Sequence, residues 1–136
     1  MDKIELVIYD LWHGNNFEQI EIRNPSLEKL YEVISKLDGM ITTEVSIYTQ
    51  EESICLCIGG GNDKLYNVYY SENYGEDNYT LKKEKFILGK VHKLITGGQV
   101  GDFEDEICVD IHVVRSVVKF FYHTGGMIKD YIWNLE

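Results

Sequence analysis

The cysteines and histidines are the residues of this chain best suited to nucleophilic or metal chemistry, but their spacing favours neither. We expect Cys55 and Cys57 to face opposite sides of one strand, where they could not share a metal ion. Cys108 and His112 lie four residues apart, but zinc needs three or four converging ligands and no second pair stands at ligand spacing. The odd cysteine count is typical of buried, reduced thiols rather than of a disulfide framework. We therefore predict no metal and no cofactor.

Nucleophilic catalysis also lacks a recognisable motif. The four histidines lie on separate segments, and no serine occupies a G-x-S-x-G elbow. The glycine run 59–61 could suggest a phosphate-binding loop, but such a loop continues into Gly-Lys-Ser/Thr and a helix, whereas Lys64 precedes a strand-like run. Asn62 and Asp63 instead favour a tight turn between two strands. We predict that the protein is not an enzyme.

Tyrosine is unusually abundant, with 10 among 136 residues, and many of these fall between positions 66 and 79. Alternation along a strand would place Tyr66 and Tyr70 on one face of a sheet and Tyr69 on the other. Half of these rings are then expected in the core, because tyrosine is a good strand former. The other half would suit a protein-binding surface, where a large ring with a polar tip is favoured.

The charge balance points to a basic partner. The chain has 13 Lys or Arg and 23 Asp or Glu residues, a formal net charge of −10. Such a surface repels phosphate backbones, so we expect no direct binding to nucleic acid. We also expect no membrane association and a cytoplasmic location, because no apolar run approaches a membrane span and no signal peptide is evident.

Much of the negative charge falls in three acidic turns, with tyrosines beside them. A solvated surface is the default interpretation of such turns, and contact with a basic partner is the functional one. The candidate contact residues are Glu51, Glu52, Tyr69, Glu72, Tyr74, Glu76, Asp77, Asp102, Glu104 and Asp105.

The elements that would position these residues predict one domain over residues 1–136 with an α+β fold. Alternating or apolar runs followed by short polar turns predict a curled antiparallel sheet of about six to eight strands. The strand-like runs lie at 3–9, 17–22, 43–49, 53–58, 65–71, 79–81, 86–88, 91–95 and 131–135, and the segment 102–106 is predicted as a turn.

Two helices should pack on this sheet. Asn24 is expected to cap the first, with Pro25 at its first position and Gly39 at its end. Asp110 is expected to cap the second, which would run to about residue 123 and end at the glycine pair 125–126.

The C-terminal third of the chain resembles a known family. Residues 107–121 (ICVDIHVVRSVVKFF), followed by Thr124-Gly125-Gly126 and then Trp133, are similar to the closing signature of the first-numbered immunity family of bacterial polymorphic-toxin systems, which is associated with deaminase toxins. The glycine run 59–61 and the strand 65–70 resemble the glycine turn and central strand of that family. Val114 stands where the family usually has alanine, and residues 127–129 lack its usual proline.

The resemblance implies an immunity protein that binds and neutralises a cognate secreted toxin. A toxin that acts on nucleic acid, such as a deaminase or nuclease, would carry a basic active-site cleft that an acidic protein could occlude. We expect a monomer, or a weak homodimer formed through a C-terminal edge strand at 131–135. The alternative is a small-ligand or regulatory binding domain that uses the concave face of the sheet.

Overall fold

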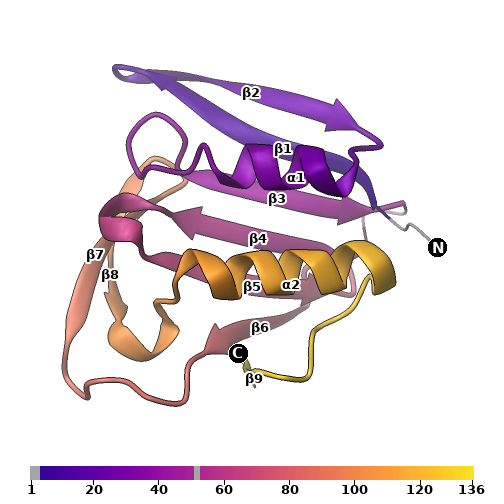
Figure 1. Cartoon of the computed structure of the whole chain (residues 1–136). Coiled ribbons are helices and arrows are strands. Elements are labelled where there is room, and N and C mark those ends of the chain that lie inside the picture. Colours follow the sequence, from indigo (N-terminus) through magenta and orange to yellow (C-terminus); the bar gives the residue numbers. More distant parts are fainter. Residues whose placement is uncertain (1–3, 51–52) are drawn as a thin grey trace.

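The structure is a computed structural model that describes residues 4–50 and 53–136. Within these residues seven strands form one antiparallel sheet in the order β2-β1-β3-β4-β5-β6-β9 (Figure 1). These strands are β1 (Ile4–His13), β2 (Asn16–Arg23), β3 (Glu44–Thr49), β4 (Cys55–Gly60), β5 (Tyr66–Glu72), β6 (Asp77–Lys82) and β9 (Ile132–Leu135). The predicted α+β fold with an antiparallel sheet and two helices is confirmed, and the C-terminal strand does lie at a sheet edge.

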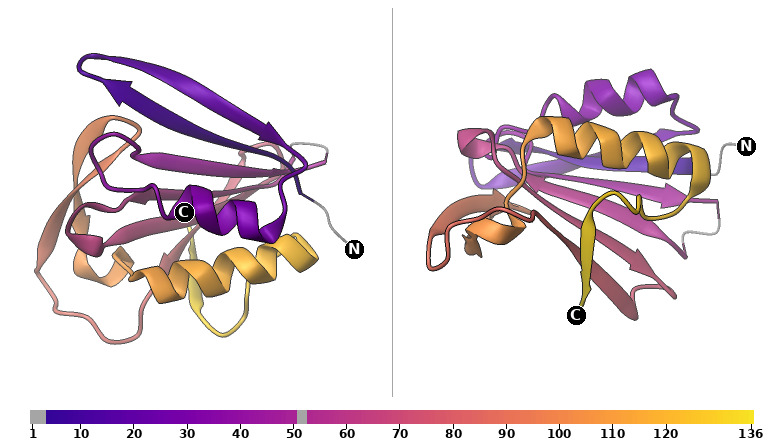
Figure 2. Two further views of the ribbon diagram at one scale, coloured as in Figure 1. Left: turned by 45° about the horizontal axis from the view of Figure 1, so that its top comes forward. Right: turned by 60° about the horizontal axis from the view of Figure 1, so that its bottom comes forward.

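Two helices, α1 (Leu27–Ile34) and α2 (Ile111–Thr124), cover the same face of the sheet (Figure 2). Buried side chains from both helices and from the sheet form one core between the layers. Tyr66 and Tyr70 share one face of β5 and Tyr69 belongs to the other, as predicted; the shared face of Tyr66 and Tyr70 is the one that enters the core. Arg115 of α2 lies over the ring of Tyr31 of α1, with 4.2 Å between its guanidinium carbon and the ring centroid. Neither helix of the described residues is long and apolar enough to span a membrane.

Helix α1 begins later than predicted. Ser26, not Asn24, is the N-cap, and its Oγ accepts a hydrogen bond from the Lys29 N–H at 3.1 Å. Asn24 has a φ of 50°, and its N–H donates to the Glu5 carbonyl at 2.6 Å. This bond holds Asn24 at the end of the β1–β2 pair, so Pro25 precedes the helix instead of opening it.

Helix α1 also ends earlier than predicted, at Ile34 rather than near Gly39. The Ser35 hydroxyl donates to the Glu32 carbonyl at 2.6 Å, which offers the backbone an alternative to continued helix. Asp38 then accepts hydrogen bonds from the backbone N–H groups of residues 40–42 and builds a separate turn. The apolar stripe still packs, because Leu37 is buried beyond the end of the helix.

Helix α2 agrees with the sequence. Asp110 is its N-cap and accepts from the Val113 N–H at 3.0 Å. Gly125 ends it with a φ of 74°, and its N–H donates to the Phe121 carbonyl. The buried side of the helix consists of Val114, Val117, Val118 and Phe121. These six positions, which belong to the segment that carries the resemblance, therefore act in helix ends and core packing.

A separate two-stranded hairpin, β7 (Val91–Thr96) and β8 (Gln99–Glu104), lies across one end of the sheet (Figure 2). The turn at 96–99 joins its strands. Gly59 permits its close approach, because a Cβ there would lie 2.5 Å from Thr96 Cγ2. The glycine run that could have suggested phosphate binding therefore ends β4 under the hairpin, and its turn continues through a 3₁₀ segment, Asn62–Lys64.

Besides the bounds of α1, three further predictions about local structure were wrong. Residues 86–88 are not a strand: they form an exposed loop, held where the Ile87 N–H donates to Asp105. The predicted acidic turn at 102–106 is the end of β8 followed by a 3₁₀ turn, Asp105–Ile107. Cys55 and Cys57 share one sheet face, because residues two apart on a strand point the same way.

Candidate functional site

The sheet face opposite the helices is covered only at the end where the hairpin crosses it, within the described part of the chain (Figure 2). Strands β1, β3 and β4 place alternate residues on this open face while their other residues enter the core. The open face is therefore lined by polar, sulfur-containing and aromatic side chains. Its central residues are Asp10, Trp12, Glu44, Ser46, Tyr48, Cys57 and Tyr69.

Asp10 organises one end of this face. It is 8% exposed and its two carboxylate oxygens accept four hydrogen bonds. The donors are the backbone N–H groups of Thr43 and Glu44, the Thr43 hydroxyl and the Trp12 indole N–H. Thr43 Oγ1 in turn accepts from the Gly98 N–H at 2.9 Å. Asp10 thereby fixes the tip of the hairpin against β1 and β3.

Trp12 is held between two neighbours. A Cβ on Gly98, whose φ is 78°, would lie 2.0 Å from Trp12 Cζ2, so the indole occupies the space that this glycine leaves. Phe17 of β2 stacks with the indole, with 4.7 Å between ring centroids and 29° between planes. The Phe17 ring remains 52% exposed. It presents an aromatic surface at the edge of the open face.

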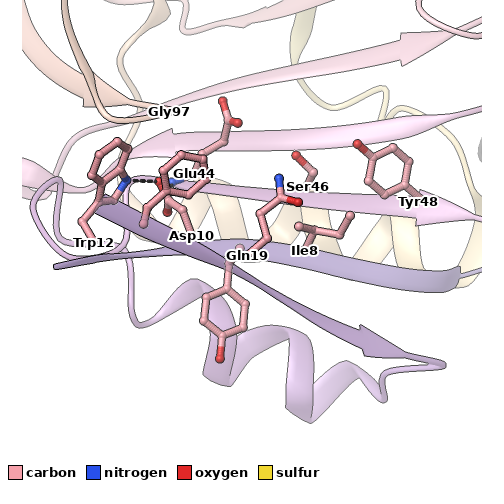
Figure 3. Close-up of a pocket in the computed structure, with 10 residues that line it drawn as sticks. Ile8, Asp10, Trp12, Gln19, Glu44, Ser46, Tyr48 and Gly97 are labelled. Carbon is pink, nitrogen blue, oxygen red and sulfur yellow. Dashed lines mark hydrogen bonds between the residues drawn. The ribbon is translucent and has the colours of Figure 1, made fainter. Parts of the chain in front are cut away.

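A cavity of about 210 Å³ opens beside these residues (Figure 3). It is smaller than the usual range for drug-sized ligands, roughly 300–1,000 Å³, and it suits a single side chain better. Carboxylate, amide and hydroxyl groups supply most of its polar atoms. The lining residues are Ile8, Tyr9, Asp10, Trp12, Phe17, Gln19, Glu44, Ser46, Tyr48 and Gly97.

Glu44 is the half-buried carboxylate of this cavity. Burial raises the pKa of Glu44, and the negative charge of Asp10 raises it further, while a hydrogen bond with Cys57 lowers it. No Lys, Arg or His within residues 4–50 and 53–136 forms an ion pair with Glu44 or Asp10. Two carboxylates thus lie close together, and neither has an ion-pair partner among the described residues.

The neighbouring thiols and phenols remain protonated at neutral pH. Burial raises the pKa of Cys55 to about 12, and burial together with the Glu44 charge raises that of Cys57 even more. Burial likewise raises the pKa of Tyr48 to about 12. Because the thiolate is the reactive form of cysteine, these thiols are unsuited to nucleophilic attack. The cluster offers hydrogen-bonding groups and one carboxylate rather than a nucleophile and base.

A second depression, of about 350 Å³, lies further along the open face. Tyr69 and Asp102, two of the predicted contact residues, both line it, together with Asn67, Asn78 and Thr80 of the sheet. The structure therefore brings together one tyrosine and one carboxylate that are 33 positions apart in the sequence. Glu104 is exposed on the same strand as Asp102.

Other predicted contact residues gather at the opposite end of the sheet. Glu72 and Tyr74 line a shallow depression with Ser53, and the Tyr74 N–H donates to the Ser53 carbonyl at 3.2 Å. Tyr74 is 77% exposed, and the turn also carries Glu76 and Asp77. Glu51 and Glu52, which precede this Ser53, lie outside the described residues.

Asp105 is not a free surface carboxylate, contrary to the prediction. It is 7% exposed, and its oxygens lie 2.8 Å from the Ile87 N–H, 2.7 Å from His92 Nε2 and 3.2 Å from Lys83 Nζ. The Ile87 N–H and the hydrogen bond with His92 hold the pKa of Asp105 well below its usual range. Asp105 fixes the base of the hairpin and is not available to a partner.

The cavity beside Glu44 was missed by the sequence analysis. The first strand was predicted to stop at Tyr9, so Asp10 and Trp12 were not placed on a sheet face. The sequence did contain one signal for this site, namely Asp10, a single aspartate inside a run of alternating residues. The pairing of Trp12 with Phe17 follows from the β1–β2 register, which the sequence alone did not provide.

The described residues contain no group of three or more His, Cys, Asp or Glu side chains placed to hold a metal ion. No protein-family model matches the chain, and a search of curated proteins finds no match. The resemblance to the immunity family therefore stays a prediction.

Proposed function

We propose that this protein is an immunity protein that binds a basic toxin domain and neutralises it by occluding its active-site cleft. The cognate toxin would act on nucleic acid, as a deaminase or nuclease does. The observation that carries the proposal is the uncovered polar sheet face of a strongly acidic chain. The cavity of this face holds the carboxylate of Glu44, which forms no ion pair with a cation of the described residues.

The charge distribution supports a basic partner. Within residues 4–50 and 53–136, five Lys and Arg side chains already pair with carboxylates of the chain, at Glu5, Glu32, Asp102, Asp105 and Glu106. The net negative charge is left for solvent or a partner to offset, and a cleft shaped for phosphates presents the complementary charge. Long-range attraction of this kind raises association rates and disfavours acidic partners.

The arrangement of the molecule supports binding rather than catalysis. The helix side of the sheet is filled by core packing, and the open face offers small depressions with protonated thiols and phenols. Shallow, polar cavities with aromatic neighbours suit side chains of a protein partner better than one small molecule. The alternative of a small-ligand domain therefore receives no specific support from this face.

Co-expression tests the proposal. The candidate toxin is the C-terminal domain of any large secreted protein that a neighbouring gene encodes. A bacterial host would produce this domain with or without the chain itself. We expect the chain to restore growth and to co-purify with the toxin domain. A chain that is folded by circular dichroism, yet neither restores growth nor co-purifies, contradicts the proposal.

A further inference from the structure

We propose that the cavity beside Glu44 receives an arginine side chain of the partner protein. The inference rests on the proposed function, because it names the chemical group through which a basic partner would engage the open face. It concerns the cavity of about 210 Å³ between β1, β2, β3 and the hairpin turn (Figure 3).

The charge of the cavity favours a cation. Asp10 has used its acceptor positions on four donors of the chain itself, so it contributes negative potential without offering a bond. Among the described residues, the side-chain hydrogen-bond partner of the Glu44 carboxylate is the Cys57 thiol, a weak donor. A cation that entered the cavity would meet one available carboxylate and the field of a second. An anion or a neutral apolar group would gain neither contact.

Several hydrogen-bond acceptors surround Glu44 in the cavity. The Gln19 amide and the hydroxyl groups of Ser46 and Tyr48 line the same cavity (Figure 3). A guanidinium group carries five N–H donors in a fixed planar fork, whereas an ammonium group carries three on a single nitrogen. A spread of acceptors around one carboxylate therefore favours arginine over lysine.

The apolar part of the cavity wall suits the methylene stem of an arginine side chain. Ile8 lines the cavity, and the exposed ring of Phe17 stands at its edge. The methylene stem of arginine can pack on such surfaces while its head group reaches the carboxylate. The Phe17 ring also offers a face for a cation–π contact with the guanidinium. Trp12 supports Phe17 from behind, since it is itself packed on Gly98.

Other candidate partners fit less well. The cavity is too small for a nucleotide or a drug-sized molecule. The carboxylate lining repels phosphate and carboxylate groups. A single basic side chain that projects from a larger protein surface matches both the size and the charge of the cavity.

Nuclear magnetic resonance on the ¹⁵N-labelled full chain tests the inference with ethylguanidinium chloride as the probe. Ethylammonium chloride at the same ionic strength is the comparison. We expect saturable shifts of the Trp12 indole N–H and the Gly97 and Gly98 amides, with a Kd of about 10 mM for ethylguanidinium and weaker binding of ethylammonium. Glu44→Gln should weaken ethylguanidinium binding by about tenfold or more. Glu76→Gln, at an exposed turn, should leave it unchanged.

Three results would overturn the inference: shifts that rise linearly with either salt, equal binding of the two cations, or unchanged binding after Glu44→Gln in a folded protein. Failure of this inference can be distinguished from failure of the proposed function. Neutralisation of the toxin by a protein whose cavity binds no guanidinium would leave the function standing and remove the cavity from it. Guanidinium binding without any toxin neutralisation would do the reverse.

Discussion

Asp105 and Glu44 stand near opposite ends of the same hairpin, and they differ in the groups that meet their charge. Asp105 lies at the hairpin base with a lysine, a histidine and a backbone N–H around it. Glu44 lies near the hairpin tip beside a second carboxylate, with no cation of the described residues paired to it. The pKa of Asp105 is accordingly lowered, while burial and Asp10 raise the pKa of Glu44.

This difference separates a carboxylate that builds the fold from one that is left for a partner. A buried charge normally persists only where its own chain compensates it. Glu44 is only half-buried, at a cavity on an uncovered face, and no cation of the described residues pairs with it. Local arrangements that cost stability are typical of functional sites, where a ligand supplies the missing contact.

The largest effect is expected at the compensated carboxylate. Asp105→Ala removes the shared partner of Lys83 and His92 and should lower the free energy of unfolding by about 3 kcal/mol. Asp102→Ala is the matched control, because Asp102 also contacts a lysine, Lys93, at 2.7 Å but on the exposed surface. It should cost less than about 1 kcal/mol in urea titrations. Equal losses for the two variants would remove the distinction between the two acids.

A slightly smaller loss is expected at the hairpin tip. Gly98→Ala would place a methyl group against Trp12 and should cost about 1–3 kcal/mol, with a change in tryptophan fluorescence. Gly14→Ala is the control, since Gly14 also has a positive φ, of 65°, but no atom within 4 Å of the added Cβ. Its cost should be limited to backbone strain of about 1 kcal/mol. If Gly98→Ala costs no more stability than Gly14→Ala does, Trp12 is not packed against the hairpin tip.

Acid should weaken the hairpin base. Because the folded pKa of Asp105 lies below its unfolded value of about 3.9, its contribution is present above that value and is lost as the pH falls through the folded pKa. Urea titrations from pH 5 to pH 2 should therefore show a steeper fall in stability for the natural chain than for Asp105→Asn. Parallel curves would contradict the lowered pKa.

Glu44→Gln should have a small effect of the opposite sign. The folded state keeps its proton on Glu44 at a higher pH than the unfolded state does, so stability falls as the pH rises through the interval between the two pKa values. Removing the charge should raise stability at pH 7 by up to about 1 kcal/mol and change little at pH 4. Glu76→Gln should be neutral at both. A destabilised Glu44→Gln at pH 7 would show that the chain does compensate this charge.

The smallest effect is expected at the far end of the sheet, in the turn that holds Glu76 and Asp77. Reversing both charges to lysine should slow association with the toxin by about threefold at low salt, and the difference should fade at high salt. Rapid-mixing kinetics would measure it. A large change in dissociation rate instead would place this turn, rather than the Glu44 cavity, at the centre of the interface.

The fold was more predictable than the site, for reasons that individual residues make clear. Alternation and the caps at Asp110 and Gly125 depend on neighbours along the chain, so they can be inferred from sequence. Asn24 failed as a cap because of a bond to Glu5, nineteen positions away, which no local pattern encodes. The strand 99–104 was missed because its polar residues look like a turn until its hairpin partner is known.

The site depends on such distant neighbours almost entirely. Asp10 acts through Thr43 and Gly98, and the raised pKa of Glu44 comes from burial and from Asp10 on another strand. The count of carboxylates in the sequence reveals the excess of negative charge. It does not reveal which of these carboxylates find a cation or N–H partner within the folded chain. For this reason Asp105 was counted among the carboxylates available to a partner.

The most direct test of the central claim is an inhibition titration of the purified toxin domain with the natural chain and with Glu44→Gln. The account predicts complete inhibition at a 1:1 ratio by the natural chain, and an inhibition constant at least about tenfold weaker for the variant, although the variant is at least as stable. Full toxin activity in the presence of excess folded natural chain would contradict the proposed function. Equal inhibition by the two proteins would contradict the role given to Glu44.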